Sequence, residues 1–488
     1  MRIEPTGEIH VAAPGSQEQP PPPEEPPRRK RRRGLLVGGV VLLLVLALGG
    51  ASAVPYVSNR LGLPWAPNLP KGDEPSPATV NLALKAPNPS ASAPTNSGVA
   101  GQLSGPAGNP ALAQLTGIVI DPATGSTLWD HSSTSPLTPA SATKLLTMSA
   151  ALLTLDHGMQ LSTKVVAGPT PDTVILVPGG DPTLSGLAPG QKSVYPGAAH
   201  LDDLVAQVKR SVGGSVRRVE IDTSLFSGDT SAPGWEAGDV PTYAAPIVSG
   251  MLDGGLVDAT NEGSHHVNDP SAALLQEFAR RLGASAGGTT TAPKSGKVLG
   301  EVHSAPITET ISRLLQLSDN TLAEMIGRQT AIATGAPATF AGVADTTKRV
   351  LSQNGFDLSG VQLSDASGLS TQNRAPAKLL AQLLAVAAAP DGKDPRTPKL
   401  RALLDGLPVA GGSGTLAGRY GDPASSPGKG WVRAKTGTLS NVNTLAGYVL
   451  DADGRVLSFT LMSNGSDQNA GRAALDVVAA ALRGCGCR

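Results

Sequence analysis

Cysteine is nearly absent from this 488-residue sequence, whose only two thiols are Cys485 and Cys487 in the closing residues. Two cysteines so close together at one end cannot form a disulfide framework across a domain. They also leave no cysteine in the body of the chain to act as a nucleophile. The sequence leaves open whether this pair is oxidised, cross-linked to another molecule or inert.

Histidine is scarce as well, and its seven positions show no spacing, with each other or with acidic residues, that is typical of metal ligands. No local signature of a histidine-dependent serine triad is visible either. The 39 basic and 39 acidic residues cancel, so no bulk attraction to nucleic acid is implied. We therefore expect no metal, no cofactor and no nucleic-acid partner.

Charge is nevertheless concentrated at one place near the start of the chain. "RRKRRR" at residues 28–33 directly precedes "GLLVGGVVLLLVLALGGASA", twenty uncharged residues that end at Ala53. A helix of that length spans about 30 Å, the thickness of a bilayer core. Because basic clusters remain cytoplasmic, this pattern predicts a single membrane-spanning segment with everything after Pro55 outside the cytoplasm.

The same segment could also be a signal that is removed. Residues 51–53, "ASA", resemble a cleavage site, and cleavage after Ala53 would give a secreted protein. The 33 residues that precede the segment are unusually long for a signal sequence, which favours an uncleaved anchor. A buried helix of a soluble domain is the third alternative, and the flanking charges disfavour it.

Composition and periodicity divide the rest of the chain. Alternating apolar residues predict strands at 115–120 and 126–131, three more strands between 432 and 463, and a closing helix from 467 to 483. Between them lies a Gly-, Asp- and Thr-rich region that reads as a mostly-β insertion with one helix at 270–282. The predicted parts are a disordered cytoplasmic tail (1–33), the apolar segment (34–54), a flexible Pro/Ser/Ala-rich linker (55–105), a discontinuous domain (106–165 and 301–488) and its insertion (166–300).

The stretch "TPASATKLLT" carries the first chemical signal. Thr138 and Pro139 suit the N-cap and first position of a helix, which would place Ser141 in the first turn and Lys144 one turn along the same face. A partly buried lysine has a lowered pKa and can act as a base. A serine hydroxyl needs such a base before it attacks a carbonyl. The pair therefore predicts a nucleophile and its base.

Two further motifs follow in order. Ser318, Asp319 and Asn320 open a second apolar helix, so that a serine and an amide can face one cleft. Lys435, Thr436 and Gly437 lie on a predicted strand, where the glycine permits a close backbone approach. The combination of Ser-x-x-Lys, Ser-x-Asn and Lys-Thr-Gly is shared by penicillin-binding proteins and class A β-lactamases.

Other copies of these short patterns lack the right context. A second Ser-x-x-Lys at 426–429 encloses Pro-Gly, which disfavours a helix. The Ser-Gln-Asn at 352–354 runs into glycine and suits a helix end, and the Lys-Ser-Gly at 294–296 lacks an apolar strand pattern. We interpret all three as fortuitous.

With these motifs, the chain from about residue 99 onward resembles the penicillin-binding D-alanyl-D-alanine carboxypeptidase/endopeptidases of the penicillin-binding protein 4 type. Further stretches carry the resemblance: "GGDPTL" (179–184), "APGW" (232–235), "DASGLS" (365–370), "LPVAGGSGTL" (407–416) and "RAKTGTLSNVNTLAGY" (433–448). It implies an α+β, multi-domain protein. The core would be transpeptidase-like (serine β-lactamase-like), with a five-stranded antiparallel sheet flanked by helices and with accessory domains inserted between the first two motifs.

The resemblance also implies a mechanism on peptidoglycan stem peptides. Ser141 would attack the carbonyl between two D-alanines with Lys144 as base, and water would then hydrolyse the acyl-enzyme. Ser318 would relay a proton to the leaving amine, and Asn320 would bind the substrate backbone. β-Lactam antibiotics would acylate the same serine and inhibit the enzyme.

The strand motif would complete this site. Lys435 would extend the proton network, and Thr436 and Thr438, on either side of Gly437, would hold the terminal carboxylate. The backbone N–H groups of Ser141 and Thr438 would form the oxyanion hole.

Two positions concern the side chain of the substrate. Members of the family often have an arginine directly after "SGLS", whereas this chain has Thr371 there and Arg374 three positions later. Asp222 is a candidate contact for the amine of a diaminopimelate residue, and an ordinary turn residue at a strand end is the equal alternative.

Two other function classes compete with this interpretation. A β-lactamase would need a glutamate that hydrolyses the penicilloyl ester, and the nearest candidate, Glu324, falls within the second motif's own helix. A non-catalytic wall-binding or sensing protein could keep the fold without the chemistry, but every motif residue is present.

Overall fold

The computed structural model describes residues 87, 88 and 90–487. The predicted cytoplasmic tail and membrane segment lie outside these residues. Within the described part of the chain, no helix combines the length and the apolar character needed to cross a membrane.

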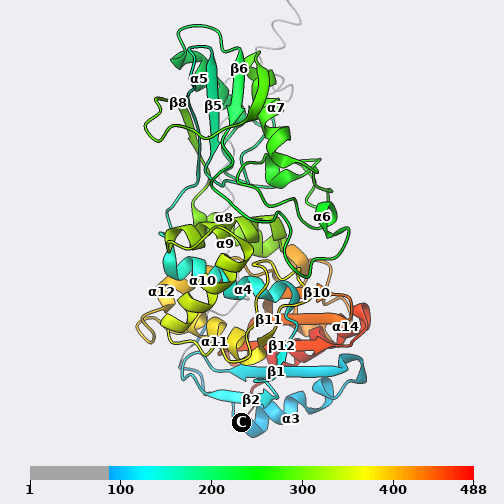
Figure 1. The fold of residues 1–488 in the computed structure, drawn as a ribbon. Coiled ribbons are helices and arrows are strands. Elements are labelled where there is room, and N and C mark those ends of the chain that lie inside the picture. The colour runs from blue at the N-terminus through cyan, green and yellow to red at the C-terminus, as the bar shows by residue number, and fades with distance from the viewer. Residues whose placement is uncertain (1–86, 89, 488) are drawn as a thin grey trace, which may run out of the picture. The chain divides into compact units, whose positions relative to one another are not determined.

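One five-stranded sheet forms the centre of the part of the chain that carries the three motifs, in the order β10-β11-β12-β1-β2 with every neighbouring pair antiparallel (Figure 1). Strands from the two ends of the described chain meet where Gln114 pairs with Asn464. The prediction of a five-stranded antiparallel sheet is confirmed. The strands are β1 (Gln114–Ile120), β2 (Thr127–His131), β10 (Arg433–Leu439), β11 (Val442–Leu450) and β12 (Val456–Asn464).

Helices cover both faces of this sheet because neighbouring residues of its strands direct apolar side chains to opposite faces. Ile118 of β1 joins one buried cluster, and its neighbour Val119 joins another on the opposite face. Helices α3 (Asn96–Ala107) and α14 (Gln468–Arg483) pack on the Val119 face. The Ile118 face is covered by α4 (Thr143–Thr154), α8 (Ile307–Leu317), α9 (Asn320–Ala333), α10 (Phe340–Gln353), α11 (Ala377–Ala388), α12 (Thr397–Leu400) and α13 (Ala402–Asp405).

Helix α3 corrects the predicted linker, which extended to residue 105. Thr95 caps this helix by accepting a hydrogen bond from the Gly98 N–H, and Val99 and Leu103 are completely buried. The small, polar composition of this stretch resembles a linker, but two apolar residues four positions apart form one helical face. Residues 96–105 therefore belong to the folded body.

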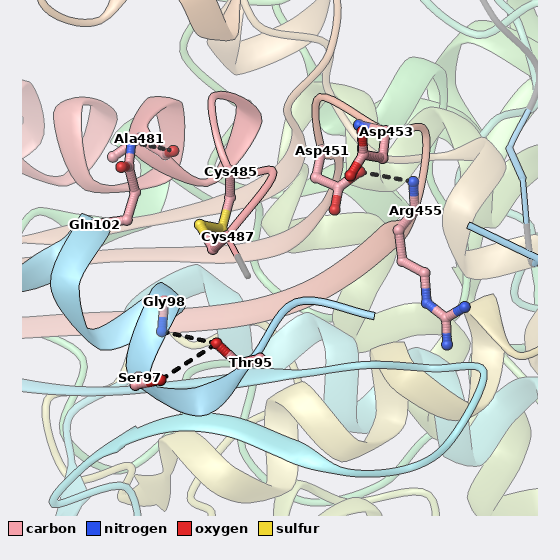
Figure 2. The surroundings of a disulfide bond; sticks show 10 residues. All are labelled: Thr95, Ser97, Gly98, Gln102, Asp451, Asp453, Arg455, Ala481, Cys485 and Cys487. Carbon is pink, nitrogen blue, oxygen red and sulfur yellow. Dashed lines mark hydrogen bonds between the residues drawn. A yellow bond between two sulfur atoms is a disulfide. The ribbon is translucent and has the colours of Figure 1, made fainter. Parts of the chain in front are cut away.

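The C-terminus closes over the same helix (Figure 2). The Thr95 N–H donates to the Cys487 carbonyl at 2.8 Å, and Gln102 Nε2 donates to the Ala481 carbonyl at 3.2 Å. Cys485 and Cys487 form a disulfide with each other. The two ends of the described chain are thus joined to each other through backbone and side-chain contacts.

A second five-stranded sheet lies between the first two motifs in sequence, in the order β7-β6-β5-β4-β8 (Figure 1). Strands β5, β6 and β7 are mutually parallel, and β4 is antiparallel to β5 and β8. Two helices, α5 and α7, share one hydrophobic cluster with it. The elements are β4 (Ser162–Ala167), β5 (Thr173–Pro178), α5 (Leu201–Ser211), β6 (Arg218–Ile221), α7 (Pro270–Leu282), β7 (Ser285–Thr289) and β8 (Val298–His303).

The expectation of a mostly-β insertion with one helix was therefore wrong. Helix α5 was missed although its buried residues Leu201, Leu204, Val205 and Val208 follow a helical period. The first and last strands of this sheet in sequence, β4 and β8, also reach Ser162 and His303, beyond the predicted limits of 166 and 300. Short elements complete the chain: β3 (Pro136–Leu137), α6 (Asp239–Thr242), β9 (Ala375–Pro376) and the 3₁₀ turns η1 (Pro110–Leu112), η2 (Ala140–Ala142), η3 (Asp253–Gly255), η4 (Gly414–Leu416) and η5 (Ser426–Gly428).

Candidate active site

Ser141 lies in η2, a 3₁₀ turn that leads directly into α4. The predicted cap at Thr138 was wrong, because α4 begins only at Thr143 and η2 has no side-chain cap. Ala140, directly before Ser141, has a φ of 47°, a left-handed conformation that is strained for a residue with a β-carbon. Such strain is typical of positions that present a functional side chain.

Strand β10 lies directly against this turn. A β-carbon added to Gly437 would be 2.5 Å from the Pro139 carbonyl oxygen and 3.2 Å from the β-carbon of Ala140. Any other residue would push the strand away from Ser141. The absence of a β-carbon at Gly437 therefore allows β10 to lie close to the backbone of the turn that carries Ser141.

Lys144 is completely buried in the first turn of α4. Its ammonium Nζ donates to Ser141 Oγ at 3.2 Å, to Asn320 Oδ1 at 2.6 Å and to the Ser367 carbonyl at 2.7 Å. Burial lowers the pKa of Lys144 to about 8, and nearby carboxylates, Asp365 first among them, oppose the shift. The amine is therefore partly unprotonated just above neutral pH and lies next to the serine hydroxyl.

A second serine and lysine face the first pair. Ser318 ends α8 in a left-handed conformation, with φ 61° and ψ 33°. Lys435 of β10 is fully buried, and its Nζ donates to Ser318 Oγ and to the Thr436 carbonyl, both at 2.8 Å. Burial, together with the charge of Lys144, lowers the pKa of Lys435 well below its usual range.

The second motif opens α9 as predicted. Asp319 caps the helix by accepting from the Leu322 N–H at 2.9 Å, and Asn320 is its first residue. The inserted region contacts both motif residues. Tyr195 Oη donates to Asp319 Oδ2 at 2.7 Å, and Asn320 Nδ2 donates to the Tyr243 carbonyl at 2.9 Å. Asn320 thus connects the catalytic lysine candidate to the insertion.

The stretch "DASGLS" fixes the carbonyl that Lys144 contacts. Asp365 is fully buried and accepts hydrogen bonds from the backbone N–H groups of Gly368 and Ser370 and from the side chain of Asn373. The resemblance had included this stretch without giving it a role. Burying an aspartate carboxylate costs free energy unless hydrogen-bond donors compensate for the lost water. These donors reach Asp365 only in this conformation of the loop, so the hydrogen bonds hold the loop in place.

Glu324 supports the same loop from α9. Its carboxylate accepts from the N–H groups of Ala366, at 3.0 Å, and Ser367, at 2.8 Å, and only 1% of the residue is exposed. Burial, with Asp365 nearby, raises the pKa of Glu324 to about 7. Glu324 does not line the cleft beside Ser141. It is therefore not placed as the water-activating glutamate of a β-lactamase.

Two adjoining cavities meet at Ser141. The first has a volume of about 790 Å³ and is lined by Ser318, Thr415 and Thr436 among others. The second, of about 550 Å³, is lined by Asn320 and by Tyr243 of the insertion, which is 61% exposed. Three residues line both cavities: Ser141, Thr438 and Arg472. The serine hydroxyl therefore faces a cleft with room on both sides for a peptide.

The structure does not bring Asp222 to this cleft. It follows β6 and accepts hydrogen bonds from the backbone N–H groups of Ser224, at 2.9 Å, and Ala292, at 2.7 Å. Asp222 lines neither cavity. Its carboxylate instead stabilises a turn at the end of β6, which fits the alternative of an ordinary turn residue.

Thr371 lines the cleft, whereas Arg374 does not. Thr371 lines the second cavity. Arg374 Nη1 donates to the carbonyls of Thr371, at 2.8 Å, and Asn373, at 2.7 Å. Arg374 therefore stabilises the loop and does not replace an arginine at position 371.

The second Ser-x-x-Lys stretch has none of this setting. Ser426 begins the short turn η5 and is half-buried, and its hydroxyl donates to the Pro423 carbonyl at 3.1 Å. It lines neither cavity beside Ser141. Across the described residues, no group of three or more His, Cys, Asp or Glu side chains is arranged to hold a metal ion.

Comparison with known proteins gives consistent matches. The model of the D-Ala-D-Ala carboxypeptidase 3 (S13) family matches residues 99–265 and 259–483. A carboxypeptidase of Mycobacterium tuberculosis is 42% identical over 419 residues, 85% of this chain and 89% of that protein. Carboxypeptidase DacB of Mycolicibacterium smegmatis is also 42% identical, over 85% of this chain and 90% of its own length.

One solved structure has the same fold. Penicillin-binding protein 4 (dacB) from Haemophilus influenzae superposes with a TM-score of 0.63 at 22% identity, covering 79% of this chain and 97% of that one. A second structure of that protein, complexed with a β-lactam, gives a TM-score of 0.57. At this identity the likeness shows the fold alone.

Proposed function

The chain belongs to the D-Ala-D-Ala carboxypeptidase 3 (S13) family and is a serine peptidase of peptidoglycan, and from this premise we propose how its residues act. Ser141 attacks the carbonyl of the penultimate D-alanine in a stem peptide and releases the terminal D-alanine. The equivalent bond in cross-linked peptides is a second substrate of the same site. β-Lactams acylate Ser141 in place of the peptide.

Acylation uses the first serine–lysine pair. Unprotonated Lys144 takes the proton of Ser141 Oγ as the oxygen attacks, and the N–H groups of Ser141 and Thr438 bind the negative charge that develops on the carbonyl oxygen. The second pair acts on the leaving group. Ser318 transfers its proton to the amide nitrogen as the C–N bond breaks and regains a proton from protonated Lys144, which leaves Lys144 unprotonated for the next step. Lys435 supplies the hydrogen bond that orients Ser318.

Deacylation reverses the roles. Water enters where the amine has left, gives a proton to the base and attacks the ester carbon. The C–O bond to Ser141 then breaks, Ser141 recovers its proton, and the shortened peptide leaves with a free carboxylate. The chain's own residues are sufficient for each proton transfer, so the proposal needs no cofactor.

The observation that carries this proposal is the convergence of two serine–lysine pairs on one cleft, with Nζ–Oγ distances of 3.2 Å and 2.8 Å. The test is mass spectrometry of the products that the purified full-length chain forms from a stem pentapeptide and from cross-linked muropeptides. We expect loss of one D-alanine from the first and scission of the second. Absence of both products would refute the proposed function.

We also propose that residues 34–54 anchor the protein in the membrane with the catalytic part outside the cytoplasm. The six basic residues at 28–33 and the apolar run that follows them support this topology. Protease added to intact spheroplasts should digest the catalytic part. Its protection in intact spheroplasts, with digestion after lysis, would reverse the topology.

A further inference from the structure

Arg472 lies in the cleft without an acidic partner of its own. It belongs to α14, and its Nε donates to Thr438 Oγ1 at 3.3 Å. Among the described residues this is the only hydrogen bond that the Arg472 side chain makes. Arg472 also lines both cavities beside Ser141. One edge of the guanidinium is therefore fixed on the strand motif while its other donors remain available.

The neighbouring arginine is arranged differently. Arg419 donates to both carboxylate oxygens of Asp476, at 2.7 and 3.0 Å. This bidentate pair engages Asp476, which is 4% exposed, and Asp476 forms no hydrogen bond or ion pair with Arg472 in the described structure. The charge of Arg419 opposes the effect of Asp476 on the pKa of Arg472.

The first cavity has one further carboxylate, Asp422, which is exposed to solvent and has no ion pair in the described structure. The second cavity has two more carboxylates, Glu236 and Asp239, and neither forms an ion pair with Arg472 in the described structure. Arg472 is thus a cation without an ion pair among the described residues, and it is bonded to a threonine of the strand motif.

Other groups at the leaving-group side cannot supply that charge as well. Thr436 and Thr438 are neutral, and the Thr436 hydroxyl already bonds the Thr415 hydroxyl at 2.8 Å. The ammonium groups of Lys144 and Lys435 are buried and engaged with their serines. A guanidinium, by contrast, remains charged at every physiological pH and matches a carboxylate with two parallel donors.

We infer that Arg472 binds the C-terminal carboxylate of the substrate and so selects peptides that end in a free acid at the scissile residue. This inference rests on the proposed function and adds to it a specificity residue outside the three motifs. The carboxylate lies between Arg472 and the hydroxyl groups of Thr436 and Thr438. Because the contact is far stronger for an anion than for a neutral amide, it discriminates between the two.

The test compares two substrates that differ only in this group: an N-acylated tripeptide ending in D-Ala-D-Ala and the same peptide with a C-terminal amide. Release of D-alanine or of its amide by the full-length protein is followed by mass spectrometry. In Arg472→Gln, kcat/KM for the acid should fall about 10- to 100-fold, the effect of losing one hydrogen-bonded charge pair. The value for the amide should change less than threefold, so the acid-to-amide ratio collapses. Arg472→Lys should recover part of the ratio.

The double variant Arg419→Gln/Asp476→Asn is the matched control, because it removes the neighbouring ion pair from the same cavity wall without leaving a free carboxylate beside Arg472. It should lower thermal stability through the loss of the Asp476 pair and leave the acid-to-amide ratio at its wild-type value. Equal losses for acid and amide in both Arg472 variants, or an unchanged ratio, would overturn the inference. Penicillin and its methyl ester give the same comparison by acylation rate if amide turnover is too slow to measure.

The two levels of the proposal fail in different ways. A wild-type protein that releases no D-alanine from the acid substrate would refute the proposed function itself. A wild-type protein that is active, with variants whose ratio is unaltered, would refute only the role of Arg472.

Discussion

The two serine–lysine pairs of the cleft have the same residue types and the same burial but different neighbours. Three carboxylates, those of Asp365, Asp319 and Glu324, favour the charged form of Lys144, whose pKa settles at about 8. Lys435 has no such support and instead faces the charge of Lys144, so its pKa falls further. Burial lowers the pKa of both lysines, and the carboxylates near Lys144 oppose this shift only at Lys144. The difference assigns proton abstraction to Lys144 and orientation of Ser318 to Lys435.

Removing the first serine should have the largest effect. We expect Ser141→Ala to abolish covalent labelling by penicillin, because within the described residues the Ser141 hydroxyl is the only hydroxyl bonded to the Lys144 Nζ. A labelled penicillin, tryptic digestion and mass spectrometry locate the adduct, which should lie on the peptide containing Ser141 in the wild type. Ser426→Ala, in the second Ser-x-x-Lys stretch, is the control and should label normally. Labelling that survives Ser141→Ala would defeat the assignment.

Removing the first lysine should have the next largest effect. Lys144→Ala should slow acylation about 10²–10⁴-fold, the usual contribution of a positioned base. Time courses of penicillin labelling measure the rate, and circular dichroism checks that the fold is retained. A folded variant that acylates at the wild-type rate would show that the base lies elsewhere.

The second lysine should matter less. Lys435→Ala should slow acylation by both peptide and penicillin on the order of 10²-fold, at the lower end of the range for proton-transfer groups. Lys435→Arg should restore only part of this loss, because a planar guanidinium does not fit the space of a compact ammonium. If Lys435→Ala were slower than Lys144→Ala, the roles inferred for the two lysines would have to be exchanged.

The carboxylates behind Lys144 should produce the smallest change. In the wild type, the acylation rate should rise with pH through a midpoint near 8, since only unprotonated Lys144 accepts the serine proton. Glu324→Gln removes a negative charge that favours protonated Lys144, so the midpoint should move to lower pH by less than one unit. Stopped-flow acylation rates at a series of pH values measure this shift. A midpoint that moves upward would contradict the inferred electrostatics.

The same variant bears on the β-lactamase alternative. Because Glu324 is buried under the "DASGLS" loop, its replacement should leave the lifetime of the penicilloyl adduct unchanged. Steady-state nitrocefin turnover in the wild type, lost in Glu324→Gln, would instead support a glutamate-assisted deacylation.

Local patterns in the sequence were sufficient to predict the three motifs and the strands of the catalytic sheet. Ser141 and Lys144 are three positions apart, so their proximity follows from one helical turn, and strand alternation is equally local. Several partners of Lys144 and Asn320 could not be predicted in this way. The carbonyl groups of Ser367 and Tyr243 are backbone atoms that every residue has, and only the fold brings them to the site.

Arg472 and Asp222 also could not be placed from local sequence patterns: the structure brings Arg472 to the cleft and leaves Asp222 away from it. An arginine on an amphipathic closing helix is most simply interpreted as a surface residue, and its place beside Thr438 depends on how α14 packs against β11. Asp222 follows a strand of the insertion, where the pattern allowed either a substrate contact or a turn. The long-range path of the chain decides both cases.

The pairing of β1 with β12 also determines when, during synthesis of the chain, the catalytic sheet can form. The strand that precedes the nucleophile is hydrogen-bonded to one of the last strands of the chain, with the whole insertion between them. Closing so long a loop is slow, and it cannot begin before the final strands have been synthesised. We therefore expect the hydrolase to be inert as a nascent chain and to acquire its activity in one late, cooperative step.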